Sequence, residues 1–173
     1  MTTEPPRRLG FIELAPGVLR RHALCYLFAA FVSIGLFAYL PALTPFVLKV
    51  NLALPTGQQG AATGNLQSWQ EIVILALVGI WGAMSDRVGR RPIYVAGFLL
   101  IAGAYVLYPL AHSMPQLTLY RLVFGCAVAA LGAMLATVLA DYPAESSRGK
   151  LTGIAFFLNA LGSVVTVGVR VTV

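Results

Sequence analysis

The chain has 173 residues, of which 58% are hydrophobic and 10% are charged, and its formal net charge is +6. Soluble domains carry about 25% charged residues, so a water-soluble fold of this composition would expose large apolar patches. The basic residues are scattered between hydrophobic segments, which argues against a nucleic-acid-binding surface. The composition therefore predicts an all-α integral membrane protein with the lipid bilayer as its solvent.

A basic segment, 1–22, precedes the first apolar run, 23–47. This run is longer than the core of a secretory signal, which has about 7–15 residues, so we interpret it as a retained membrane span. Residues 55–64, rich in glycine and polar side chains, predict a loop after it. A spanning helix needs about 20 mostly apolar residues. The runs that meet this length divide residues 23–173 into five predicted spans: 23–47, 65–85, 92–112, 117–140 and 151–169.

The distribution of basic residues predicts the orientation, because cytoplasmic loops collect lysine and arginine. Nine basic residues fall on one side of the predicted spans, and the loops of the other side hold only Lys49. The nine precede the first span or follow the second and fourth: Arg7, Arg8, Arg20, Arg21, Arg87, Arg90, Arg91, Arg148 and Lys150. We therefore expect a cytoplasmic N-terminus in a multi-pass protein of a cell membrane, taken to be a bacterial inner membrane.

The connection between the second and third spans reads Gly82-Ala-Met-Ser-Asp-Arg-Val-Gly-Arg-Arg91. A plain basic loop would need the arginines, but neither the aspartate nor the two glycines. The segment resembles the signature loop of the major facilitator superfamily, a family of transporters with twelve helices. The matched positions that we expect to form a conformational switch are Gly82, Asp86, Arg87, Gly89, Arg90 and Arg91.

The resemblance implies that Asp86 docks on a helix of the second half of such a transporter and latches one conformation. Gly82 would allow a close helix approach in the membrane, and Gly89 can adopt a backbone conformation with positive φ that other residues resist. The alternative is a positively charged loop that only anchors the helices at the lipid surface.

Two further segments resemble signatures of the same family. Arg121 and Gly125 match its Arg-x-x-x-Gly pattern in the fourth helix, although Phe124 stands where the family often has glutamine. Arg121 either assists proton transfer or substrate contact, or it snorkels to the membrane surface. Gly125 begins a repeat of small residues that marks helix packing. In the loop after this helix, the resemblance implies a charge relay between Asp141 and Arg90, against the alternative of a solvated turn.

Polar side chains within the predicted spans are candidates for a function, because burying a polar group in a bilayer costs free energy. We predict Glu71 as the proton-titrating acid or a contact for a cationic substrate; the alternative is a glutamate that merely complements a helix dipole. Tyr39 lies near Pro41 and Pro45, which either unwind the first span or only kink it. Asn159 contacts substrate or bridges helices. Aromatic residues near span ends, among them Tyr108, predict an interfacial belt.

These features predict a secondary active transporter of a small solute by alternating access, proton-coupled and directed to drug or metabolite export. Uptake by symport and facilitated diffusion stay open within transport, and a non-transporting scaffold or receptor stays open outside it. An enzyme is not expected, because His22 and His112 lie at opposite membrane faces, about 30 Å apart. We expect no cofactor and no metal. The resemblance implies that this chain is the N-terminal part of a longer transporter and needs the remaining helices as partners.

Overall fold

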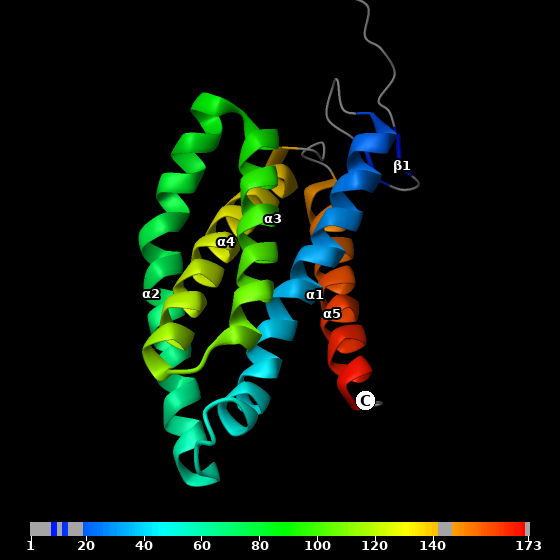
Figure 1. Ribbon diagram of the computed structural model, residues 1–173. Helices are drawn as coiled ribbons and strands as arrows, with labels where there is room; N and C mark the ends of the chain where they lie inside the picture. Colours follow the sequence, from blue (N-terminus) through cyan, green and yellow to red (C-terminus); the bar gives the residue numbers. More distant parts are fainter. Residues whose placement is uncertain (1–7, 10–11, 14–18, 142–146, 172–173) are drawn as a thin grey trace, which may run out of the picture. The chain divides into compact units, whose positions relative to one another are not determined.

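The computed structural model describes residues 8–9, 12–13, 19–141 and 147–171. Their helices are α1 Arg20–Val50, α2 Thr56–Val88, α3 Arg90–Leu107, α4 Met114–Asp141 and α5 Arg148–Val171, with a short 3-10 helix, η1 Tyr108–Leu110, after α3 (Figure 1). The predicted all-α class is confirmed. A small antiparallel pair of strands, β1 Arg8–Leu9 and β2 Ile12–Glu13, was not expected from the sequence.

Three of the described segments are long and apolar enough to cross a membrane, namely Arg20–Val50, Arg90–Leu110 and Met114–Leu139. They contain the predicted spans 23–47, 92–112 and 117–140, except for residues 111, 112 and 140 at the ends of the second and third of these. Helices α2 and α5 contain the predicted spans 65–85 and 151–169. That these two helices also cross the membrane stays a prediction.

The start of α2 corrects the predicted loop at 55–64. The helix begins at Thr56, directly after Pro55, whose φ of −56° and ψ of 141° place it just outside the helix. Gln59 donates a hydrogen bond from Nε2 to the Leu54 carbonyl at 2.9 Å. Each glycine in a helix costs about 1 kcal/mol relative to alanine, but a helix that continues for 33 residues tolerates this cost. The glycines therefore did not mark a loop.

The first helix continues through both of its prolines. Pro41 and Pro45 lie inside α1, which has no break between Arg20 and Val50. Each proline removes one backbone hydrogen bond, yet the segment is not unwound. The expectation of an unwound segment at this place is wrong, and Tyr39 lies on a continuous helix.

The chain divides into two compact units, one of residues 40–134 and the other of residues 1–39 with 135–173. In the unit of residues 40–134, α4 packs against both α2 and α3. A Cβ atom on Gly125 of α4 would lie 3.3 Å from the Gln70 carbonyl oxygen of α2, and one on Gly97 of α3 would lie 2.8 Å from Leu131 of α4. Small residues thus allow these helices to approach closely, as membrane helices require.

In the other unit, the first part of α1 packs against α5 (Figure 1). A Cβ atom on Gly162 would lie 3.0 Å from the carbonyl oxygen of Phe31, so glycine permits this contact. Ala23 and Leu151 form a small buried cluster between the two helices. The Tyr26 hydroxyl donates a hydrogen bond to the Leu135 carbonyl at 2.9 Å, and the Glu13 backbone N–H donates one to Ser147 Oγ at 3.0 Å.

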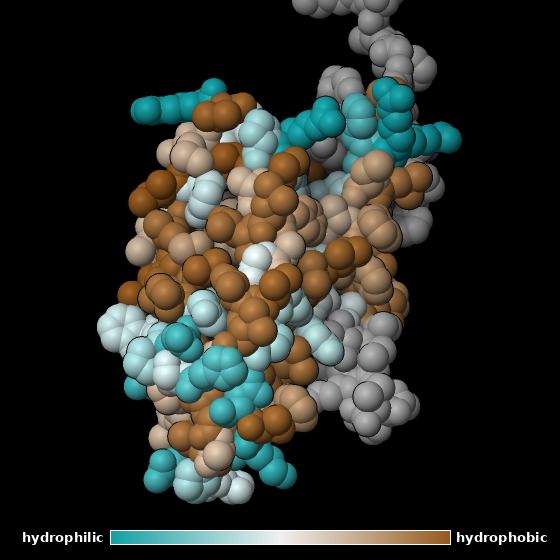
Figure 2. Space-filling model, in the orientation of Figure 1, coloured by the Kyte–Doolittle hydropathy of each residue, from teal (hydrophilic) through white to brown (hydrophobic). Residues whose placement is uncertain are grey.

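Large apolar side chains cover much of the outer surface. Leu75, Phe28 and Leu99 are 75%, 70% and 68% exposed. In Figure 2, hydrophobic residues cover much of the visible face, and hydrophilic residues gather near the ends of the helices. A soluble monomer does not expose apolar surface on this scale, and a lipid environment accounts for it.

Candidate functional site

The connection between α2 and α3 consists of Gly89 alone. Its φ of 96° and ψ of 159° lie in a region of backbone conformation that is essentially restricted to glycine. Its N–H donates a hydrogen bond to the Ser85 carbonyl at 2.9 Å, and the buried Ser85 hydroxyl donates to the Gly82 carbonyl at 2.7 Å. The positive φ expected of Gly89 is confirmed.

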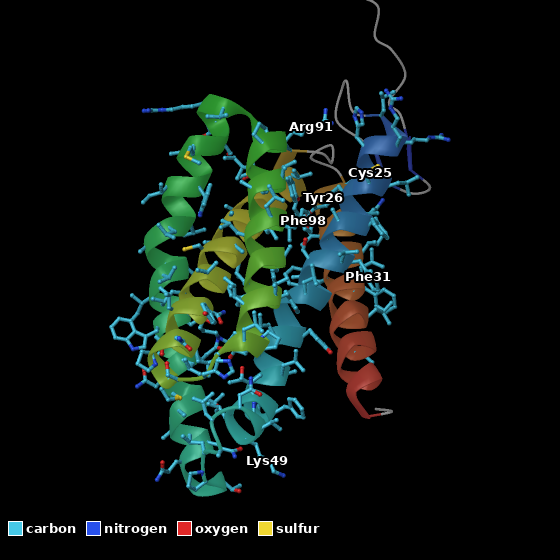
Figure 3. All side chains as sticks on the ribbon, in the orientation of Figure 1. Cys25, Tyr26, Phe31, Lys49, Arg91 and Phe98 are labelled. Carbon is cyan, nitrogen blue, oxygen red and sulfur yellow. The ribbon has the colours of Figure 1, made fainter. Side chains whose placement is uncertain are left out.

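The charged side chains of this turn mostly face outward. Asp86, Arg87 and Arg91 are exposed, and Arg90 is half-buried (Figure 3 labels Arg91). Within the described residues, the Asp86 carboxylate has neither a hydrogen bond nor an ion pair, and nothing lies within 4 Å of a Cβ atom placed on Gly82. The latching contact of Asp86 and the close helix approach at Gly82 therefore stay predictions.

Three of these four charges are placed against the helix dipoles, whereas Arg87 is a cation in the last turn of α2, where the dipole favours it. Asp86 lies in the last turn of α2, where a dipole favours cations, and Arg90 and Arg91 open α3, where a dipole favours anions. Each such placement costs about 0.3–1 kcal/mol at an exposed site. Local helix stability does not explain this order of charges.

The buried site of the molecule is centred on Arg121 of α4. Its side chain is 0% exposed, so the snorkelling alternative is wrong. Nη2 donates a hydrogen bond to Gln67 Oε1 of α2 at 2.7 Å, and Nη1 donates one to Thr44 Oγ1 of α1 at 3.3 Å. The guanidinium carbon lies 5.6 Å from the centre of the Phe124 ring, within the range of a cation–π contact. Arg121 thus joins three helices of one unit.

The two hydrogen-bond partners of Arg121, Thr44 and Gln67, each form a further side-chain hydrogen bond. On one side, the hydroxyl groups of Thr44 and Tyr108 lie 2.8 Å apart and share a hydrogen bond. On the other side, Gln67 donates a hydrogen bond from Nε2 to Glu71 Oε1 at 2.6 Å. We call these five residues the Arg121 network: Tyr108, Thr44, Arg121, Gln67 and Glu71.

The Arg121 network corrects the sequence analysis in part. Tyr108 is 1% exposed and is therefore not part of an interfacial aromatic belt. Glu71 is exposed, and the amide of Gln67 links its carboxylate to the buried charge of Arg121. Gln67, Thr44 and Tyr108 were not predicted as site residues. The signal for Gln67 was its position one turn before Glu71 on the same helix face.

The remaining predicted residues lie apart from this network. A Cβ atom on Gly125 would meet Gln70 and Val73 of α2, which supports its predicted role in helix packing. Tyr39 is half-buried on α1. Asp141 is exposed and ends α4, and its relay with Arg90 stays a prediction. The side chain of Asn159 lies outside the described residues.

The described residues contain no group of three or more His, Cys, Asp or Glu side chains that could hold a metal ion. Cys25 is exposed, Cys126 is half-buried, and both are free thiols.

A family model of the Major Facilitator Superfamily matches residues 22–169 of this chain. The chain belongs to the Major Facilitator Superfamily. Its charged turn and Arg121 both lie within the matched residues.

Individual superfamily members are similar at low identity. Magnetosome protein MamH of Paramagnetospirillum magneticum is 28% identical over 152 residues, which are 83% of this chain and 35% of the relative. Tetracycline resistance protein, class E, of Escherichia coli is 35% identical over 128 residues, which are 73% and 30% of the two chains. Citrate exporter 1 of Aspergillus niger is 27% identical over 124 residues, or 72% and 22%. The matched region spans between about a fifth and about a third of these relatives.

Proposed function

We propose that this chain supplies helices to a secondary active transporter that moves a small solute across a membrane by alternating access, with proton coupling through Glu71. The observation that carries the proposal is the buried Arg121. A charge within a membrane-length helix is costly and rare unless it serves transport or finds partners. Here it connects α1, α2 and α4 and is linked to an exposed carboxylate.

The turn at Gly89 supports the alternating-access part of the proposal. Asp86, Arg90 and Arg91 are placed against the local helix dipoles, so these three charges are better explained by a contact outside α2 and α3. A latch formed by Asp86 with another helix would be such a contact. A turn that can only adopt its conformation with glycine would hold Asp86 in a fixed position for that contact.

The solute class is proposed as a small organic molecule, and the direction as export. Two relatives are named Citrate exporter 1 and Tetracycline resistance protein, class E. The alternatives are uptake by symport, facilitated diffusion and a non-transporting scaffold. Measuring solute movement and proton movement together distinguishes them.

The experiment reconstitutes the natural polypeptide that carries these residues in proteoliposomes containing a pH-sensitive dye. Citrate and tetracycline are the probes, and movement of each labelled probe is measured together with proton movement. We expect solute flux against an imposed proton gradient in the wild-type protein. Glu71→Gln keeps the size of the side chain and one acceptor oxygen but cannot titrate, so it should lower proton movement by about 10²–10⁴-fold, the contribution of one positioned proton-transfer group.

The outcomes separate the alternatives. Solute movement without proton movement in the wild-type protein would indicate a facilitator. Movement of the solute in the same direction as the protons would indicate uptake by symport. Unchanged coupling in Glu71→Gln would contradict the role of Glu71. If neither citrate nor tetracycline moves across the membrane, the result would favour the non-transporting scaffold.

A further inference from the structure

Gln67 occupies the one position that links the two charges of the Arg121 network. Its Oε1 accepts from Arg121 Nη2 at 2.7 Å, and its Nε2 donates to Glu71 Oε1 at 2.6 Å. A guanidinium has donors only, and an ionised carboxylate has acceptors only. The amide therefore fits between them in a single orientation, with its oxygen toward Arg121 and its nitrogen toward Glu71.

Protonation of Glu71 would weaken this arrangement. Hydrogen bonds to ionised groups are roughly twice as strong as those between neutral groups, so a neutral Glu71 holds the Gln67 amide less firmly. The charge of the guanidinium would then lose the compensating carboxylate, and a buried charge without compensation destabilises its surroundings. The effect reaches α1 and η1, because Arg121 also donates to Thr44, which is hydrogen-bonded to Tyr108.

We propose that Gln67 is a positioning residue that couples the ionisation of Glu71 to the buried Arg121, so that α2 is held firmly against α4 and α1 while Glu71 is ionised and loosely when it is protonated. Its use in a transport cycle rests on the proposed function. The other charged or titratable groups of the network are Arg121 from α4 and Tyr108 from η1, while α1 contributes the neutral Thr44.

The test measures thermal unfolding of the purified protein in lipid nanodiscs between about pH 7 and about pH 3, a range that includes the ordinary pKa of a glutamate side chain, about 4.3. The variants are Gln67→Met, Glu71→Gln and both together. Gln58→Met is the matched control, because Gln58 lies on the same helix, is exposed, and its side chain has no hydrogen bond within the described residues.

An ionised, hydrogen-bonded carboxylate stabilises the fold above its titration range, and this stability is lost as the pH falls. We expect the Tm of the wild-type protein to drop by about 3–6 °C over this range through Glu71. Glu71→Gln should remove this component. Gln67→Met should remove most of it, the double variant should add nothing further, and Gln58→Met should behave as wild type.

Gln67→Glu guards against a Gln67→Met variant that does not fold. It keeps an acceptor for Arg121 and has no N–H for an ionised Glu71, so the protein should fold and show a pH profile different from that of the wild type. A wild-type pH profile in either Gln67 variant, or additive effects of Gln67→Met and Glu71→Gln, would overturn the inference. No solute is involved, so a protein that shows this coupling and moves no solute would contradict only the proposed function. A protein that moves solute and lacks this coupling would contradict only this inference.

Discussion

At position 89 the backbone has a φ of 96° and a ψ of 159°, which a residue with a Cβ atom adopts only under strain of about 1–3 kcal/mol. A steric clash is not the reason, because a Cβ atom at this position would lie 4.0 Å from the Pro92 ring, an ordinary van der Waals distance. The requirement for glycine at this turn is therefore conformational.

Gly89→Ala tests this requirement. We expect it to lower the free energy of unfolding by about 1–3 kcal/mol through backbone strain, measured as thermal unfolding in nanodiscs. The control is Gly79→Ala in the exposed, uncrowded middle of α2, which should raise stability by up to about 1 kcal/mol because alanine is the better helix former. Equal effects of the two changes would contradict the conformational explanation.

Sequence reasoning identified one end of the contacts made by Arg121 and by Glu71, but neither end of the contact between Thr44 and Tyr108. Arg121 and Glu71 stood out because ionisable groups are rare in apolar runs. Thr44, Gln67 and Tyr108 are neutral and common in helices, and their importance arises from contacts between residues 54 to 77 positions apart. Such contacts depend on how the helices pack, which a single sequence does not specify.

At the scale of the elements, apolar runs predicted the position of each helix but not all of its ends. Predicted spans describe the part of a helix that lies in lipid, whereas α2 begins nine residues before the predicted span, at Thr56 instead of residue 65. Its first turns are polar, so hydropathy gave no signal for them. Pro55 was the available signal, since proline often stands at a helix start.

Gly97 shows how closely α3 and α4 approach. A Cβ atom there would lie 2.8 Å from both Cγ and Cδ2 of Leu131, so Leu131 would have to move. We expect Gly97→Ala to lower stability by about 1–3 kcal/mol, as overpacking of a filled interface does. Thermal unfolding in nanodiscs measures it.

Gly103→Ala is the matched control for this prediction, because it makes the same change six residues later in α3, where nothing lies within 4 Å of the new atom. It should be neutral or stabilising through helix propensity. If Gly103→Ala lowers stability as much as Gly97→Ala does, the close approach of α3 and α4 would not explain the effect at Gly97.

At the scale of the whole molecule, the order of helices and the distribution of charges predict the orientation in the membrane. Three described segments meet the length and apolarity of a span, and α2 is not among them. Its 33 residues reach about 50 Å, which exceeds the hydrocarbon thickness of about 30 Å. Figure 3 shows Lys49 and Arg91 at opposite ends of the unit of residues 40–134. Because Lys49 ends α1 and Arg91 opens α3, these two residues report on whether α2 crosses the membrane.

We therefore predict opposite accessibility for cysteines placed at these two exposed positions, in a background with Cys25→Ser and Cys126→Ala. A membrane-impermeant maleimide applied to intact cells should label Lys49→Cys, and it should label Arg91→Cys only after permeabilisation, because basic loops stay in the cytoplasm. Denatured protein labelled to the same extent in both variants controls for expression and thiol reactivity. Labelling of both positions from one side would mean that α2 does not cross the membrane, and the reverse pattern would mean that the N-terminus is not cytoplasmic. The first result would remove the membrane crossing of α2 on which the alternating-access proposal depends, and the second would reverse the predicted orientation of the chain.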